Sequence, residues 1–464
     1  MNFFKLYKYL RIKPFDTSTE GGRSQERYRL ALWSFIANIL SKLMALAVML
    51  FSIRWTLPYL GAERFGVWMT VSSFATMLIV LDLGIGNALT NHAAHAAAED
   101  EPEALKKTIS GSLGFLFIVS LGMGLLLTFL AATLPLNTLI KVKDSTLLPE
   151  IRQAVLMFAI LFGVNLFGSG VQKLFSGLQR TFEGLLASAV CSFLALICIA
   201  WAAHFEADIP ILLLATLGVQ SLSGIVLLPI LMKRNQFSFM GIGKEIQQQY
   251  KTLFKNGSLY FVLQLGVLFG WGADSMIISS TLGAASVAAY SIAQRLFQMC
   301  TLALHMLNGP LWGAYADANS RNDKAFIRIT FKRSMAVTIG LSLLIILFLL
   351  VFNKPIIGVW LNNNVELPLT LLLAFAAWTF MESVVGSFSI LLNGLNITRP
   401  QIISMFIYIA ISLFLKLYYI DQYGIIVIPL ATAFAYFVAK FLFYRFFFYK
   451  DIKASLRDTN LTKA

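Results

Sequence analysis

The chain has 464 residues, of which 58% are hydrophobic and 13% are charged, and its mean hydropathy is +0.74. These values exclude an ordinary soluble globular protein and indicate a polytopic membrane protein. The formal net charge of +14 is spread over several loops and both ends, so it does not indicate a nucleic-acid-binding face.

Twelve apolar stretches are long enough to cross a bilayer, which takes about 20 helical residues. The sequence therefore predicts an all-α polytopic membrane protein with about 12 transmembrane helices. In the first half of the chain the predicted spans are 30–53, 65–85, 109–130, 151–171, 184–204 and 209–232. In the second half they are 257–282, 287–311, 335–353, 367–391, 402–420 and 425–444.

Lys and Arg residues predict the orientation, because they concentrate in cytoplasmic segments. Residues 1–29 carry seven of them, and the tail 445–464 carries five. With an even number of spans, both termini are predicted to be cytoplasmic. The basic segment 1–29 is too long for a cleaved signal peptide, and the short external loops leave no room for a soluble catalytic domain.

Two pairs of similar segments predict an internal repeat. YLGAERFGVW (59–68) resembles TLGAASVAAY (281–290), and SGLQRTFEG (176–184) resembles NGLNITRPQ (393–401). The members of each pair follow equivalent spans at nearly the same offset. We therefore expect an N-lobe of six helices at 30–232, a cytoplasmic linker at 233–256 and a C-lobe of six helices at 257–444, arranged around a central cavity.

The stretch LPYLGAERFGVWMTVSSFATMLIVLDLGIGNALTNHAAHA (57–96) resembles the early signature of polysaccharide flippases of the O-antigen type. These proteins belong to the multidrug/oligosaccharidyl-lipid/polysaccharide exporter superfamily. The span count, the short loops and the repeat extend the resemblance over most of the chain. The resemblance implies a transporter that moves a lipid-linked oligosaccharide, usually on undecaprenyl pyrophosphate, from the cytoplasmic to the outer leaflet.

The eighth predicted span carries polar side chains at helical spacings of three and four, which places them in one stripe. They are Gln294, Gln298, Thr301, His305 and Asn308, with Arg295 on the flank. Such a stripe faces a bundle interior or a watery cavity, since an arginine at mid-membrane costs about 2.5 to 3.5 kcal/mol. We expect Arg295 either to bind a pyrophosphate head group or to neutralise a carboxylate such as Asp274 or Glu382.

The first predicted span has a second polar face, which includes Asn38 and Lys42. Lys42 is a candidate for a second cation on the same head group; the alternative is that its long stem reaches backbone carbonyls. Lys416 and Lys440 lie near span ends, so they are expected to be interfacial anchors.

Three carboxylates within or beside spans are candidates for gating or ion coupling. Asp82 precedes two glycines at the end of the second span, where it forms part of a gate or caps a helix end. Asp274 and Glu382 either bind a coupling H+ or Na+ or neutralise the cations above. Apart from a coupling ion, the sequence predicts no cofactor, no metal site and no phosphate loop for ATP.

The leading functional hypothesis is a flippase for lipid-linked oligosaccharides that works by alternating access in the cell inner membrane. Its expected partners are the lipid-linked oligosaccharide, membrane lipids and other polysaccharide assembly proteins. The alternatives are a cation-coupled multidrug extruder of the same superfamily and a membrane-embedded sugar polymerase or ligase. An extruder of cationic drugs calls for an acidic cavity, whereas this chain places Arg295 and Lys42 at mid-span.

Overall fold

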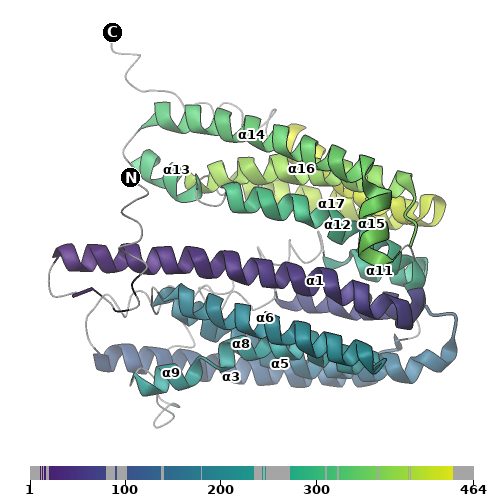
Figure 1. Cartoon of the computed structure of the whole chain (residues 1–464), viewed down its shortest axis with the longest axis horizontal. Coiled ribbons are helices and arrows are strands. Elements are labelled where there is room, and N and C mark those ends of the chain that lie inside the picture. Colours follow the sequence, from purple (N-terminus) through teal and green to yellow (C-terminus); the bar gives the residue numbers. More distant parts are fainter. Residues whose placement is uncertain are drawn as a thin grey trace. The chain divides into compact units, whose positions relative to one another are not determined.

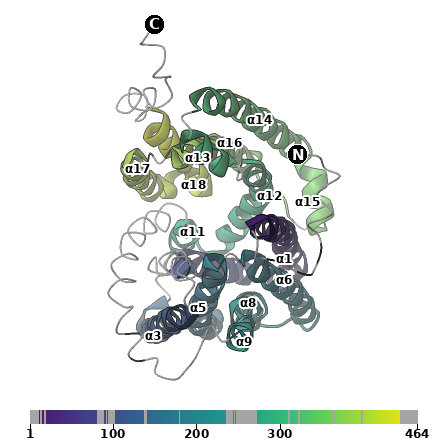
Figure 2. The ribbon, with the colours of Figure 1, turned by 90° about the vertical axis from the view of Figure 1, so that its left-hand side faces the viewer.

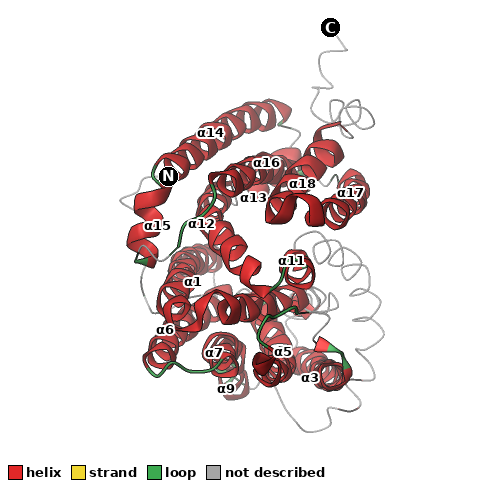
Figure 3. Ribbon diagram, turned by 90° about the vertical axis from the view of Figure 1, so that its right-hand side faces the viewer, coloured by secondary structure: helices red, strands yellow, loops and turns green. Residues whose placement is uncertain are grey.

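The structure is a computed structural model of the whole chain. It describes residues 11, 13, 15–16, 20–79, 89–90, 93, 102–136, 140–178, 180–234, 243, 246, 272–308, 311–320, 323–362, 365–395, 397 and 399–442. Every regular element in these residues is a helix, as Figure 3 shows. This confirms the predicted all-α fold.

The helices in the first half begin with α1 (Glu20–Ile79) and α3 (Pro102–Thr133) (Figure 1). A short 3-10 turn, η2 (Ser145–Leu147), leads into α5 (Leu148–Gly177) and α6 (Thr181–His204). The sixth predicted span is made of consecutive short helices with a π-helical segment, η3, between the first two. These are α7 (Ile209–Leu213), η3 (Leu214–Gly218), α8 (Val219–Ile225) and α9 (Leu228–Lys233).

The second half contains α11 (Asp274–Thr281) and α12 (Ala284–Asn308), followed by α13 (Leu311–Ser320) and α14 (Lys324–Val351). Next come α15 (Asn353–Leu361), α16 (Leu369–Gly394) and α17 (Arg399–Tyr423). The chain then passes through a 3-10 turn, η5 (Gly424–Ile426), into α18 (Val427–Tyr436) and a π-helical end, η6 (Phe437–Leu442).

The chain divides into two compact units. Unit 1 comprises residues 1–61, 71–137 and 144–265, and unit 2 comprises residues 62–70, 138–143 and 266–464. In unit 1, α5 packs against α3, α6, α7 and α8. In unit 2, α16 packs against α12, α13, α14 and α18 (Figure 2). Each unit is thus built around one central helix.

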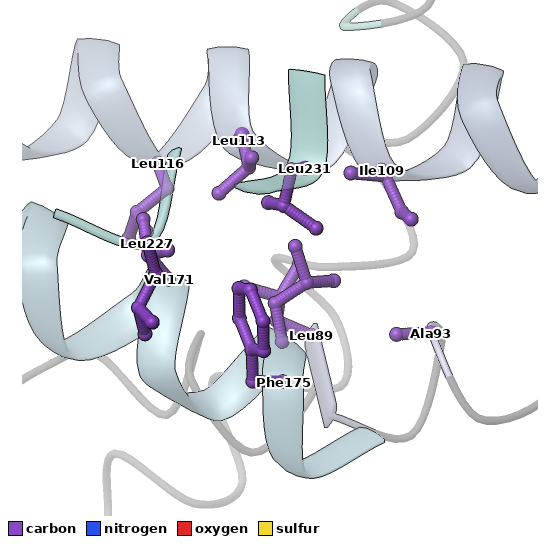
Figure 4. Close-up of a cluster of buried hydrophobic side chains, with 10 residues drawn as sticks. Leu89, Ala93, Ile109, Leu113, Leu116, Val171, Phe175, Leu227 and Leu231 are labelled. Atoms are coloured by element: carbon purple, nitrogen blue, oxygen red, sulfur yellow. The ribbon is translucent and has the colours of Figure 1, made fainter. Parts of the chain in front are cut away.

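Tight side-chain packing joins α3 to α5 in unit 1. Figure 4 shows Ile109, Leu113 and Leu116 of α3 gathered with Val171 and Phe175 of α5. Lipid tails are as apolar as these side chains, so van der Waals contact, and not transfer out of water, holds such helices together.

The described residues contain eight helical segments that are long and apolar enough to cross a membrane. Two of them, 32–74 and 400–442, are 43 residues long, about twice what one crossing needs. Each long segment contains one glycine with positive φ, Gly61 at 66° and Gly424 at 68°. These glycines divide the segments into the predicted first and second spans and the predicted eleventh and twelfth spans.

The connection between the first two predicted spans is a kink between two helices, and α1 comprises both of them. Its break from helical geometry lies at Gly61, where φ is 66° and ψ is 175°. Glycine has no Cβ, so it adopts this conformation at little cost. The eighth predicted span, α12, is helical throughout, but its polar stripe keeps its hydropathy below that of the eight membrane-crossing segments.

One further helix boundary differs from the prediction, and the structure adds two short helices. The ninth span was expected to begin at residue 335, but α14 begins at Lys324 because the Asp323 carboxylate accepts a hydrogen bond from the Phe326 N–H at 2.9 Å. The short helices α13 and α15 were not predicted. Hydropathy locates the bilayer-embedded part of a helix, whereas capping residues decide where the helix begins and ends.

Candidate functional site

Arg295 lies near the middle of α12 in unit 2 and is half-buried. Its Nη2 atom donates to the Sδ atom of Met69 at 3.9 Å, and a thioether is a weak acceptor. Within the described part of the chain no carboxylate forms an ion pair with Arg295, so the expected pair with Asp274 or Glu382 is not formed. Most of the N–H donors of the guanidinium are therefore available to bind an anion.

The other residues of the predicted stripe on α12 have different surroundings. Gln294 is half-buried, and Gln298 and His305 are exposed. Asn308 is buried, and its Nδ2 atom donates to Thr338 Oγ1 of α14 at 3.0 Å. Gln298 and His305 of the stripe are therefore accessible to a ligand, whereas Asn308, at its end, joins α12 to α14 through a hydrogen bond.

A small cavity in unit 2 brings two predicted site residues together. His305 of α12 and Glu382 of α16 both line it, beside Gly386. Its volume is about 10 Å³, which is room for about one water molecule. A Cβ atom at Gly386 would lie 3.8 Å from His305 Cε1, an ordinary van der Waals distance, so the imidazole lies beside α16 at this residue. A carboxyl and an imidazole on one small cavity are suited to holding a proton.

Asp274 forms a buried ion pair with Lys416, which corrects the expectation that Lys416 is an interfacial anchor. Lys416 Nζ lies 2.5 Å from Asp274 Oδ1, and the two side chains are 0% and 2% exposed. Tyr290 of α12 donates its hydroxyl to Asp274 Oδ2 at 2.9 Å. Both carboxylate oxygens are therefore bonded, and the neutralising cation is Lys416 instead of Arg295 or Lys42.

Lys440, also expected to be an interfacial anchor, instead forms a hydrogen bond between two helices. It is half-buried in the π-helical end of the last span, and its Nζ atom donates to Ser404 Oγ of α17 at 2.6 Å. The hydrogen bond joins two helices of unit 2.

The predicted cationic residue of unit 1, Lys42, is half-buried on α1, as is Asn38. Among the described residues neither side chain has a hydrogen bond or an ion pair. Ser41, which belongs to the same polar face, lines a cavity with Ala45. Asp82, the predicted gating residue, lies outside the described residues.

The cavity beside Ser41 is larger, about 290 Å³, and it lies within unit 1 between α1, α5, α6 and α8. Its wall consists of six serines, two glutamines, one asparagine and one alanine. This cavity was not predicted from the sequence. Asn165, Ser169 and Gln172 of span four recur at helical spacing in an apolar stretch, and this pattern could have indicated it.

Two glycines bring α5 and α8 close enough for this wall to form. A Cβ atom at Gly224 would lie 1.8 Å from the carbonyl oxygen of Gly168, and one at Gly168 would lie 2.5 Å from that of Ser221. The close approach permits side-chain bonds across the two helices. Asn165 Nδ2 donates to Ser221 Oγ at 3.0 Å, and Gln172 Nε2 donates to Ser223 Oγ at 2.6 Å.

The two repeated motifs meet within unit 2. A Cβ atom at Gly66, in YLGAERFGVW, would lie 1.7 Å from the carbonyl oxygen of Ala284, in TLGAASVAAY. The backbone of Lys141 lies against the second motif, since its carbonyl accepts from the Ala284 N–H at 3.0 Å and its N–H donates to the carbonyl of Ser279, just before that motif, at 3.3 Å. The carboxylate of Glu63 accepts from the neighbouring N–H of Lys143.

Residues 28–311, well over half of the chain, match the family described as polysaccharide biosynthesis protein. The chain belongs to this polysaccharide biosynthesis family. A curated relative, described as a putative O-antigen transporter of Salmonella typhi, is 21% identical over 391 residues, covering 83% of this chain and 88% of that protein. The resemblance inferred from the signature motif is confirmed.

Several solved structures share the fold of this family member. One is an inward-facing multidrug resistance MATE family transporter of the MOP superfamily, with a TM-score of 0.72 and 13% identity over 91% of this chain and 96% of that one. The lipid II flippase MurJ, in an inward closed conformation, has a TM-score of 0.66 and 14% identity over 92% and 88%. The MATE transporter VcmN of Vibrio cholerae, in its bent form, has a TM-score of 0.58 and 18% identity over 94% and 99%.

Proposed function

We propose that the protein is a flippase that moves a lipid-linked oligosaccharide from the cytoplasmic to the outer leaflet for the export of a surface polysaccharide. Membership in the polysaccharide biosynthesis family and the likeness to a putative O-antigen transporter support this function. The expected substrate joins a glycan to a polyprenyl lipid through a pyrophosphate. The polar part passes through the protein, and the lipid tail stays in the membrane.

The observation that carries the proposal is the state of Arg295. A half-buried guanidinium in the middle of a membrane helix, bonded only weakly to a thioether, is suited to a diphosphate. Its planar donors match two phosphate oxygens at once. Lys42, Asn38, Gln294, Gln298 and His305 remain proposed contacts to the same substrate.

Transport is proposed to proceed by alternating access, with H+ or Na+ as the coupling ion. Glu382 is the preferred coupling residue, because it lines a water-sized cavity with His305. Asp274 is less suited, because Lys416 and Tyr290 already bond both of its oxygens. Asp82 remains a proposed gating residue.

The second candidate function is a cation-coupled multidrug extruder, which the likeness to MATE transporters favours. The two functions differ in the charge that the protein must bind. Arg295 and Lys42 suit an anionic head group better than a cationic drug.

Depletion of the protein in its own cells tests the function. We expect the lipid-linked oligosaccharide to accumulate on the cytoplasmic leaflet, where an impermeant glycan-labelling reagent reaches it only after the membrane is opened. Normal export of the glycan together with altered drug sensitivity would instead identify an extruder.

We further propose that the protein lies in the inner membrane with both termini in the cytoplasm. The basic residues of segments 1–29 and 445–464 support this orientation. Other polysaccharide assembly proteins are proposed partners, since a flipped glycan needs enzymes that extend or transfer it.

A further inference from the structure

Three of the six serine hydroxyl groups in the wall of the unit 1 cavity donate their protons to carbonyls of their own helices and not into the cavity. Ser221 Oγ donates to the Leu217 carbonyl at 2.6 Å, and Ser223 Oγ donates to the Gln220 carbonyl at 2.6 Å. Ser169 Oγ likewise donates to the Leu166 carbonyl at 2.9 Å. A serine has one hydroxyl proton, so these three oxygens face the cavity as acceptors.

This arrangement fixes the orientation of the two neighbouring amides. Ser221 and Ser223 can only accept, so the NH2 groups of Asn165 and Gln172 must point toward them. Gln172 Nε2 also donates to Ser188 Oγ at 2.9 Å. The carbonyl oxygens Asn165 Oδ1 and Gln172 Oε1 have no hydrogen-bond donor among the described residues, and they add two more acceptors to the wall.

The wall is therefore neutral and rich in acceptors. None of its ten residues carries a formal charge. Acceptor oxygens repel a phosphate and attract a ligand that brings O–H donors. With a volume of about 290 Å³ the cavity is at the small end of ligand pockets, which span about 300–1,000 Å³, so it fits one ring of a glycan and not a whole oligosaccharide.

We propose that the cavity of unit 1 binds one sugar ring of the transported glycan through the hydroxyl groups of that ring. This inference rests on the proposed flippase function. It separates two tasks in the protein: the guanidinium of Arg295 binds the anionic head group, and the amide and serine wall of unit 1 binds neutral sugar hydroxyls.

Cysteine protection in purified full-length protein tests the inference. In a background that carries Cys191→Ala, Cys198→Ala and Cys300→Ala, Gln220→Cys places one thiol in the cavity wall. The control is Ser145→Cys, on an exposed surface of η2. The probes are lipid-linked oligosaccharide extracted from depleted cells, polyprenyl pyrophosphate without sugar, and NaCl.

We expect only the glycosylated lipid to slow maleimide labelling at position 220, and no probe to affect position 145. Any of four results would overturn the inference: equal protection by the sugar-free lipid, protection by NaCl alone, absence of protection, or a thiol at position 220 that never reacts. Protection by NaCl would assign the acceptor wall to a cation.

Two further substitutions, each made in the Gln220→Cys background, sharpen the test. Asn165→Leu removes an acceptor but leaves Ser221 bonded to its own helix, and it should weaken protection about tenfold. Ser192→Val narrows the cavity without touching the amide bonds, and the same loss is expected. Unchanged protection in both variants contradicts a sugar contact.

The test distinguishes failure of the proposed function from failure of this inference. If the depleted cells flip their glycan normally, the proposed function is wrong. If flipping depends on the protein but the glycosylated lipid does not protect position 220, only this inference is wrong.

Discussion

Lys416 and Asp274 show how much a single buried contact can change the interpretation of a membrane sequence. The sequence did not predict a contact between them. Asp274 was a candidate for ion coupling, and Lys416 was expected to reach water because it lies close to a span end. In the structure they are almost fully buried and 2.5 Å apart. A charge in this position is tolerated because its partner is charged and further hydrogen bonds complete the pair.

Removal of one partner should therefore be more harmful than removal of both. Lys416→Met leaves a buried carboxylate without its cation, and we expect a loss of about 3–5 kcal/mol of stability. Asp274→Asn combined with Lys416→Met should recover most of it. Thermal unfolding of the purified variants in detergent measures the difference, and equal destabilisation by the single and double changes would contradict the pairing.

Arg295 is expected to act on transport and not on folding. Arg295→Ala should insert normally but lose transport, whereas Arg295→Lys should keep part of it because it retains the charge without the planar fork. Leu307→Ala, at an exposed position of the same helix that is not a proposed substrate contact, is a comparison for general effects on α12. Flipping of glycolipid in reconstituted vesicles is the measurement, and wild-type transport by the alanine variant would exclude a phosphate contact.

The carboxylate of Glu26, in the first turns of α1, bonds to the backbone of Phe15. It accepts from Arg29 Nη2 at 2.6 Å and from the Phe15 N–H at 2.9 Å. The hydrogen bond from Arg29 holds the pKa of the Glu26 carboxyl below its usual value, while its partial burial opposes this shift. A lowered carboxyl pKa contributes stability above the unfolded pKa, and this contribution is lost as the pH falls through the folded pKa.

Glu26→Gln should therefore speed hydrogen exchange at the Phe15 amide at neutral pH. The difference from wild type should shrink as the pH falls below 4.5 and through the lowered pKa of the wild-type carboxyl. Hydrogen-exchange mass spectrometry of a peptide that contains Phe15 measures the exchange rate, after correction for the intrinsic effect of pH on exchange. A difference that is constant down to low pH contradicts the assigned role.

At the scale of helices, hydropathy and polar spacing predicted where membrane segments lie, and glycines decided how closely they approach. The polar stripe on α12 and the spans around it could be deduced from periodicity. The contact of Gly224 with Gly168 could not, because nothing in either segment alone shows which helix faces which. For the same reason the amide and serine wall of unit 1 appeared only when four helices were placed together.

Gly224→Ala tests this contact. A Cβ atom there would lie 1.8 Å from the Gly168 carbonyl oxygen, so α5 and α8 must move apart. We expect lower thermal stability and loss of glycolipid protection in the unit 1 cavity. The matched control is Gly122→Ala on α3, where nothing lies within 4 Å and the change should be neutral or slightly stabilising. Equal behaviour of the two variants would contradict close helix packing.

At the scale of the whole molecule, the repeat predicted from short sequence matches has structural counterparts. Gly61 and Gly283 occupy equivalent positions in the first pair of motifs, and both have positive φ, at 66° and 90°. Gly177 and Gly394 occupy equivalent positions in the second pair, and each is the last residue of its helix. The glycines of the first pair fall where a positive φ favours glycine.

The orientation of the chain is tested by labelling from the two sides of the membrane. In a cysteine-free background, Ser145→Cys should react with an impermeant maleimide added outside, and Ser455→Cys in the basic tail should react only after the membrane is opened. The reverse pattern, or labelling of both from one side, would contradict the orientation predicted from the basic segments.

The pair of Asp274 and Lys416 also constrains how the protein is made. Its two members are 142 residues apart in the chain. At roughly 5–20 residues per second, the ribosome delivers the lysine about 7–28 s after the aspartate. During that interval the helix that carries Asp274 enters the membrane without its counter-charge, and it must wait beside the insertion machinery or near the bilayer surface. The C-terminal half is thus expected to assemble late and as a unit, once its eleventh span arrives.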